Sequence, residues 1–255
     1  MTNQYKDNQS QPYNQLHQIA QGLYATPTTQ LPFDPRFEFK SFILEREGDN
    51  IVIYHSGHLK DVQPDIQQLG GAAKVLMNHD HESLGGPNQL DMPYIIHQDD
   101  AKALTRSIAI QDYFNERQML YDDLEVIPTP GHTPGTTMFL WDNGEHRYLF
   151  TGDFLCFEGD SWRTVILGSS DRERSIQSLE LIKTLDFDVL VPWVSIKEGP
   201  FAYFVENEEE KQQQIQNLKQ SIQTYNYYNN TILTETIELN NFVIFARDNA
   251  ILPLV

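Results

Sequence analysis

The segment TPGHTPGTTMFL (residues 129–140) and the shorter LFTGD (residues 149–153) decide the fold that this sequence predicts. Two Pro-Gly pairs surround His132 and force a rigid turn directly before a strand. The strands TTMFLW and HRYLFT flank an Asp-Asn-Gly-Glu turn at residues 142–145, where Asn-Gly supplies the positive φ angles of a tight primed hairpin. We predict a hairpin with His132 at its entrance and Asp153 at its exit. Taken alone, each residue is also explained as a turn cap.

A second pair of candidate ligands lies upstream, in KVLMNHDHESL (residues 74–84). His79 and His81 come directly after a short apolar run that is typical of a buried strand. If the chain stays extended, the period of two places both imidazoles on one side, which is half of a zinc site. The alternative interpretation is a pair of solvent-exposed loop histidines, because short motifs often occur by chance.

Taken together, these segments resemble the metallo-β-lactamase superfamily in the order His-x-His, Gly-His-Thr-Pro-Gly, Thr-Gly-Asp. DNIVIYHSG (residues 49–57) is similar to the strand that precedes the first ligand loop of that family, and RSIQSLELIKTLDFDVLVP (residues 174–192) resembles the helix and strand before its last ligand. The resemblance covers about residues 20–200. It implies an α+β fold, a four-layer αβ/βα sandwich with two sheets face to face, helices outside and a metal at one edge.

The sequence departs from the family pattern at the second metal site. The family motif His-x-His-x-Asp-His is replaced here so that Ser83 and Leu84 stand at the positions of the last two ligands. Val194, in VPWVS, stands where the family has its final histidine. Because Leu and Val cannot bind a metal, the resemblance implies a site with one ion.

The resemblance implies that His79, His81 and His132 hold this ion, Zn²⁺ or Fe²⁺, with Asp153 near the open fourth position. Such an ion brings the pKa of a bound water toward ~7, and Asp153 would orient or deprotonate that water as the catalytic residue. The subset His79, His132 and Asp153 is the two-His, one-carboxylate arrangement that suits iron and oxygen chemistry, and we rank it lower.

Three further residues near the ligand loop have alternative explanations. The family commonly has an Asp-x-Gly after the preceding strand, where the acid supports the ligands from behind, and this chain has His55 there. His55 or His58 would support a ligand, act as a base, or be a buried structural histidine. Glu82 would either reach toward the ion or be a solvated loop acid.

We expect a metal-dependent hydrolase of a small-molecule ester, thioester or amide that uses metal-bound hydroxide. The alternative is a non-catalytic relative that binds a ligand or partner, and a lesser one is a mononuclear iron dioxygenase. Residues 98–123 and 157–169 are the loops expected to set specificity. Within the second, Trp162 and Arg163 would either line a pocket or serve packing.

Composition limits the partners of the chain. Its 255 residues carry 18 Lys and Arg against 36 Asp and Glu, a formal charge of −18, which disfavours nucleic acid and anionic lipid. We expect a cytoplasmic protein with no membrane partner, because neither a signal peptide nor an apolar run of about 20 residues is present. A homo-oligomer is compatible with these features. Cys156 is the single cysteine, so thiolate clusters and intrachain disulfides are excluded.

The chain is expected to form one domain over residues 19–255, after a flexible polar lead-in at 1–18 that is rich in Asn and Gln. Ser170 and Glu173 have the spacing of a capping box at the start of an amphipathic helix. Other predicted elements are the helices 99–106, 170–185 and 207–225, and the strands 22–26, 39–46, 50–55, 74–78, 93–97, 124–128, 187–192 and 242–247.

Overall fold

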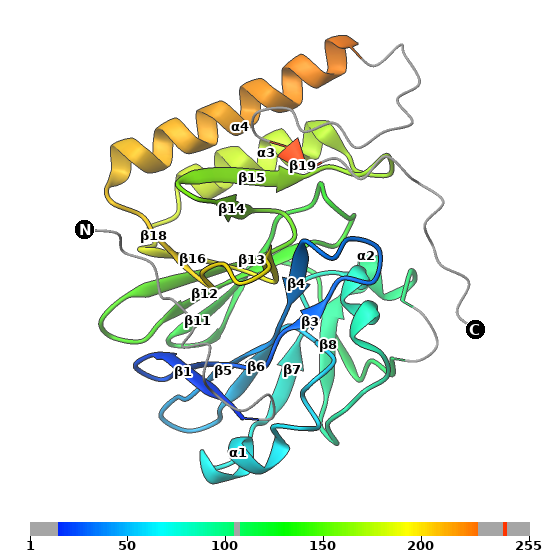
Figure 1. The fold of residues 1–255 in the computed structure, drawn as a ribbon, viewed down its shortest axis with the longest axis vertical. Helices are drawn as coiled ribbons and strands as arrows, with labels where there is room; N and C mark the ends of the chain where they lie inside the picture. The colour runs from blue at the N-terminus through cyan, green and yellow to red at the C-terminus, as the bar shows by residue number, and fades with distance from the viewer. Residues whose placement is uncertain (1–14, 105–107, 229–241, 244–255) are drawn as a thin grey trace.

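Two large sheets packed face to face form the centre of the computed structural model, which describes residues 15–104, 108–228 and 242–243 (Figure 1). The first sheet contains, in spatial order, β1 (His17–Ala20), β2 (Leu23–Ala25), β5 (Phe42–Leu44), β6 (Ile51–Ile53), β7 (Lys74–Leu76), β8 (Tyr94–His97) and β9 (Asp112–Phe114). The second contains β10 (Gln118–Tyr121), β11 (Leu124–Pro128), β12 (Thr137–Asp142), β13 (Arg147–Gly152), β16 (Val189–Pro192) and β18 (Tyr203–Phe204).

The alternation of side chains along these strands explains the layers. In β6, Ile51 and Ile53 face the core between the sheets, whereas Val52 faces the outer layer. In β13, Phe150 faces the same central core and Leu149 the opposite outer layer. Since all of these side chains are fully buried, both sheets are apolar on both faces and require helices outside them.

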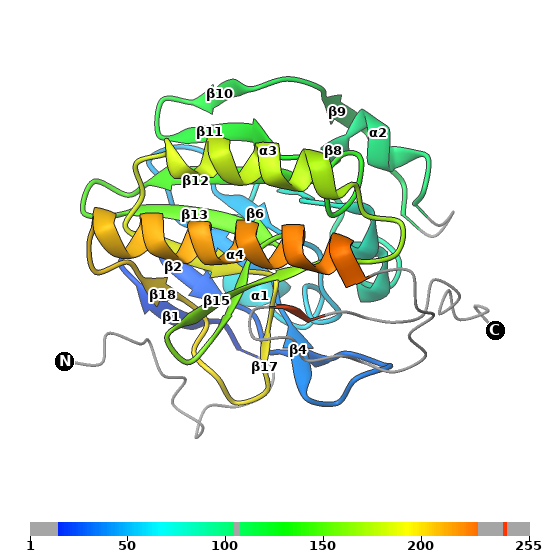
Figure 2. The same ribbon diagram turned by 90° about the horizontal axis from the view of Figure 1, so that it is seen from above.

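Helices cover the two outer faces. On the second sheet, α3 (Arg172–Lys183) and α4 (Glu208–Tyr228) lie side by side (Figure 2). On the first sheet lie α1 (Gln63–Gln68) and the short α2 (Gln98–Ala101). The predicted α+β fold, a four-layer αβ/βα sandwich, is therefore confirmed.

Two small sheets complete the architecture. One contains β14 (Cys156–Glu158), β15 (Ser161–Val165) and β19 (Phe242–Val243), and the other β17 (Val194–Ile196), β4 (Phe37–Phe39) and β3 (Thr29–Gln30). The single strand predicted over 39–46 is wrong, because the chain leaves one sheet after Phe39 and enters another at Phe42. Between them the Lys40 N–H donates to the Trp193 carbonyl, which ties this crossing to the strand that carries Val194.

The predicted hairpin is confirmed, with Asp142 opposite Arg147. The turn differs from the prediction that both Asn143 and Gly144 have positive φ angles. Among the turn residues, only Gly144 has a positive φ, of 86°. Asn143 contributes its side chain instead, because Oδ1 accepts hydrogen bonds from the N–H groups of Glu145 and His146.

The predicted helices 170–185 and 207–225 are confirmed, but the predicted capping box is wrong. The N-cap of α3 is Asp171, whose side chain accepts a hydrogen bond from the Arg174 N–H. Ser170 donates its hydroxyl to the His132 carbonyl oxygen and so anchors the ligand turn to the helix start. The predicted helix 99–106 is shorter, since α2 ends at Ala101 and residues 105–107 lie outside the described ranges.

Near the start of the chain, β1 begins at His17, two residues before the expected start of the domain at residue 19. Residues 1–14 of the predicted lead-in, and 244–247 of the last predicted strand, lie outside the described residues. No helix in the described ranges is long and apolar enough to cross a bilayer.

Candidate metal centre

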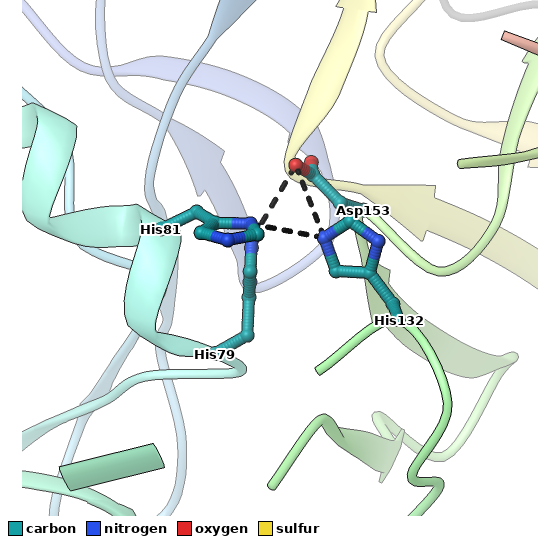
Figure 3. Close-up of side chains that lie close together, drawn as sticks. All are labelled: His79, His81, His132 and Asp153. Carbon is teal, nitrogen blue, oxygen red and sulfur yellow. Dashed lines mark hydrogen bonds and ion pairs between the residues drawn. The ribbon is translucent and has the colours of Figure 1, made fainter. Parts of the chain in front are cut away.

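Four predicted site residues converge at one edge of the sandwich, although they lie far apart in sequence (Figure 3). His79 and His81 follow β7 of the first sheet, His132 lies on the turn between β11 and β12, and Asp153 follows β13. One potential ligand atom from each residue lies within 4.8 Å of the others. Among the described residues, this is the one group of three or more His, Cys, Asp or Glu side chains that is arranged to hold a metal.

His79 occupies the centre of this group and is fully buried. Its Nε2 lies 3.4 Å from Asp153 Oδ2, and its Nδ1 lies 3.7 Å from Glu82 Oε1 on the opposite side of the ring. The backbone at His79 is extended, and the chain then enters a 3₁₀ helix, η1 (Asp80–Gly85). The premise of an extended His-x-His segment is therefore wrong, and His81 reaches the group from the first turn of η1.

His132 is fixed in one orientation and one tautomer. Its Nδ1 lies 2.9 Å from the Val165 carbonyl oxygen, and because a carbonyl only accepts, Nδ1 must carry the proton. Nε2 is then left with a lone pair, and it lies 3.1 Å from His81 Nδ1 and 3.9 Å from Asp153 Oδ2. This is the orientation that metal ligation through Nε2 requires.

Asp153 is directed toward the histidines by the glycine before it. Gly152 has a φ of 60°, and a Cβ there would overlap the side-chain amide of Asn78. The Gly152 N–H donates to the Tyr54 hydroxyl at 2.8 Å, and that hydroxyl donates to the Val191 carbonyl at 2.8 Å. The position of Asp153 therefore depends on hydrogen bonds between the two large sheets.

The four residues fit a metal ion. Ligands at about 2.0–2.1 Å from a tetrahedral ion lie roughly 3.4 Å apart, which is close to the separations observed here. Asp153 Oδ1 and both ring nitrogens of His79 are buried without a hydrogen-bond partner in the described part of the chain. Buried polar atoms normally have a hydrogen-bond partner or a bound ion, and a cation among the four residues would provide a partner for His79 Nε2.

Electrostatics at the group also favour a cation. Burial acts against a charge on His79, but Asp153 and Glu82 outweigh burial and raise the pKa of His79 to about 10. Burial and the neighbouring imidazoles lower the pKa of His81 to about 4 and that of His132 to about 3. His81 and His132 are therefore neutral at pH 7 with lone pairs available, and metal binding would displace the proton from His79.

One residue that supports the site was not predicted from the sequence. Asp100 in α2 is buried, and its Oδ1 accepts from the Gly135 N–H at 2.6 Å. Its Oδ2 accepts from the Thr133 hydroxyl at 2.6 Å and from the Asp80 N–H at 3.3 Å. One carboxylate thus connects the loop of His79 and His81 to the turn of His132. The only sequence signal was an acid next to the predicted strand 93–97.

Comparisons with known proteins agree with this architecture. Residues 71–192 match the sequence profile of the "Metallo-beta-lactamase superfamily". The metallo-β-lactamase GOB-18 from Elizabethkingia meningoseptica superposes with a TM-score of 0.58 at 16% identity, over 86% of this chain and 95% of that one. The metallo-β-lactamase FIM-1 from Pseudomonas aeruginosa, in its mono-zinc form, gives 0.62 at 13% identity, over 79% and 94%. The chain has the fold of the metallo-β-lactamase superfamily.

Sequence similarity to curated proteins is limited to a short segment. "Protein artemis" from Danio rerio is 40% identical over 67 residues, which are 26% of this chain and 10% of that protein. The protein of the same name from Homo sapiens is 41% identical over 54 residues, 21% of this chain and 8% of that protein. This chain therefore matches a tenth or less of the length of these relatives.

Within this metallo-β-lactamase fold, the residues at the expected second-site positions are poor ligands. Leu84 lies in η1 and is 42% exposed, whereas Val194 is buried and opposite Phe39 in the pairing of β17 with β4. Ser83 lies beside Leu84 in η1. Neither Leu84 nor Val194 has a polar atom in its side chain, so neither can serve as a metal ligand.

The structure shows the surroundings of the residues for which the sequence allowed several explanations. His55 is buried, with Nε2 3.0 Å from the Gly86 carbonyl oxygen, and is therefore a structural histidine. His58 pairs with Asp61 at 2.9 Å on the surface. Glu82 is fully buried, so neither alternative for it is correct: it does not lie in solvent, and its oxygens face backbone N–H groups and His79. Trp162 packs in the core against Phe187.

Proposed function

We propose that the chain is a hydrolase that holds one metal ion, Zn²⁺ or Fe²⁺, and cleaves a small-molecule ester, thioester or amide. The observation that carries this proposal is the convergence of four ligand atoms from His79, His81, His132 and Asp153 within 4.8 Å. Three imidazoles with a carboxylate beside the fourth position suit a catalytic zinc site, which keeps one position for water, better than a structural one, which normally contains cysteines. The FIM-1 structure in its mono-zinc form supports one ion as a workable state of this fold.

The bound ion would act as a Lewis acid and lower the pKa of a water. The protein would supply orientation and a proton acceptor. Histidine neighbours outweigh burial and hold the pKa of Asp153 below its usual value, so this carboxylate is ionised at neutral pH. Its Oδ2 faces His79 and His132, and Oδ1 is left to accept a proton. The side chains of His81 and Asp153 are 33% and 14% exposed, so substrate would approach from their side.

Metal analysis of protein purified without added metal or chelator tests this proposal. We expect one ion per chain and hydrolysis of at least one member of a panel of small esters, thioesters and amides. His132→Ala should lose both, and His58→Ala, which changes a half-buried side chain paired with Asp61 at the surface, should keep both. Protein that neither carries nor takes up a metal would overturn the proposal. Hydrolysis of the panel without oxygen consumption distinguishes the hydrolase from the iron dioxygenase.

A second candidate is a ligand-binding relative without catalysis, favoured by the apolar residues at the second-site positions. The triple variant Ser83→Asp, Leu84→His, Val194→His distinguishes the two. If the wild-type protein is inactive on the panel with one ion bound and the variant gains a second ion and activity, the binding protein is the better description. Activity of the wild-type protein with one ion supports the hydrolase.

A further inference from the structure

Glu82 is a buried carboxylate that the proposed reaction does not use. Its side chain is 0% exposed, although it lies in the same short segment as His79 and His81. Oε1 accepts from the Asn78 N–H at 2.6 Å, and Oε2 accepts from the His55 N–H at 2.7 Å. These two bonds hold the carboxylate between the end of β6 and the start of the ligand loop. Burying a carboxylate costs free energy unless its oxygens are hydrogen-bonded or paired with a charge.

The side chain that Glu82 faces is the ring of His79. If His79 binds an ion through the Nε2 that faces His132 and Asp153, its Nδ1 must keep a proton. That N–H is buried, and it has no hydrogen-bond partner within 3.5 Å among the described residues. The facing acceptor is Glu82 Oε1, at an ion-pair distance of 3.7 Å. A slight rotation of the ring on metal binding would bring the two atoms within hydrogen-bond range.

We propose that Glu82 is the positioning residue of the metal centre, which holds His79 in the Nδ1–H tautomer and directs Nε2 toward the ion. This inference rests on the metal site proposed above. Glu82 acts through His79 and touches neither ion nor substrate. Because both of its oxygens are also bound to backbone N–H groups, Glu82 fixes the ring relative to β6 as well as to its own loop. Acceptors that hydrogen-bond a metal-binding histidine typically contribute 10–100-fold to metal affinity.

A double-mutant cycle on metal affinity tests the role of Glu82. Zn²⁺ affinity is measured by competition with a chromophoric chelator for wild-type protein, Glu82→Gln, His79→Ala and the double variant. Glu82→Gln should weaken binding at least about tenfold in the wild-type background. In the His79→Ala background the same change should have little further effect, because the residue through which it acts is gone. Equal losses in both backgrounds would overturn the proposal and make Glu82 a general support of the loop.

A second measurement needs no variant of Glu82 and covers the case in which Glu82→Gln does not fold. In zinc-loaded wild-type protein, ¹⁵N-resolved imidazole spectra should place a slowly exchanging proton on His79 Nδ1, assigned with His79→Ala. A His79 ring protonated at Nε2 would overturn the inference. Failure of the wild-type protein to bind either Zn²⁺ or Fe²⁺ would overturn the proposed function together with this inference. Equal losses in both backgrounds with the metal bound overturn this inference alone.

Discussion

Gly152 lies where β13 ends and the chain turns toward the three histidines, and its missing side chain is what allows Asn78 to pack there. Asn78 donates its side-chain amide to the Thr137 carbonyl, at the start of the hairpin. Single residues with unusual surroundings therefore determine where Asp153 lies. The same holds for Tyr54, which has a φ of 68° and carries the hydroxyl that binds Gly152. Positive φ is costly for a residue with a side chain, so such positions indicate a structural or functional constraint.

We expect Gly152→Ala to lower the free energy of unfolding by more than about 3 kcal/mol, because left-handed strain adds to steric overlap with Asn78. Gly159→Ala is the matched control: its φ is 57°, and no atom lies within 4 Å of the added Cβ. This control should lose only about 1 kcal/mol. Chemical denaturation of both variants gives the comparison, and equal losses would mean that the contact with Asn78 is unimportant.

His55 should make stability depend on pH. Burial lowers the pKa of His55 from 6.5 to about 4, so between these values the unfolded chain binds a proton that the folded protein excludes. This contribution to stability is complete above pH 6.5 and is lost as the pH falls toward 4, to a total of about 3 kcal/mol. The measurement is the free energy of unfolding against pH for wild-type protein and His55→Gln. The wild-type protein should lose about 3 kcal/mol more than the variant, and parallel curves would contradict the prediction.

At the scale of elements, α2 and η1 are short helices that hold ligand loops rather than build the core. The buried Asp100 of α2 binds both loops, and Gly135 allows this approach, since a Cβ there would lie 2.8 Å from the carboxylate. Burial and the nearby Asp80 raise the pKa of Asp100, and they outweigh the hydrogen bonds from Thr133 and Gly135, which lower it. The carboxylate of Asp100 accepts hydrogen bonds from both ligand loops, and an amide, which has only one acceptor oxygen, cannot accept all of them.

Asp100→Asn should destabilise the protein by about 2 kcal/mol and weaken zinc binding, because an amide NH₂ would face one of the three donors now bound. Asp99→Asn is a suitable control, since this neighbouring side chain is 54% exposed and surface changes usually stay within about 0.5 kcal/mol. Thermal unfolding of the metal-free proteins and zinc titration separate the two effects. A variant with wild-type stability and affinity would show that Asp100 does not brace the loops.

Elements with local signals could be predicted from the sequence, and those that depend on distant partners could not. The hairpin follows from Asn143-Gly144, and α3 follows from the spacing of its apolar residues. The helix start was misjudged because Ser170 bonds to His132, 38 residues away. The four candidate ligands could be selected from residue type and order, and the structure brings them together. The supporting roles of Glu82 and Asp100 could not be predicted, because burial and hydrogen bonding to other loops exist only in the folded chain.

At the scale of the whole molecule, charge sets the range of partners. The formal charge of −18 opposes binding to phosphate backbones. We expect no change in the fluorescence anisotropy of labelled duplex DNA at low salt, the condition that most favours ionic binding. Binding that weakens as salt is added would contradict this expectation and reveal a local basic surface.

The arrangement of the ligands has a mechanical consequence. Two of them follow a strand of one large sheet, and the other two belong to the opposite sheet. An ion at this edge would therefore link the two large sheets, and its removal would weaken the contact between the sheets at this edge. The Gly152 N–H donates to the Tyr54 hydroxyl across the two sheets. Amide hydrogen exchange near these two residues should therefore become faster on metal removal, and more so than at the opposite edge of the sheets.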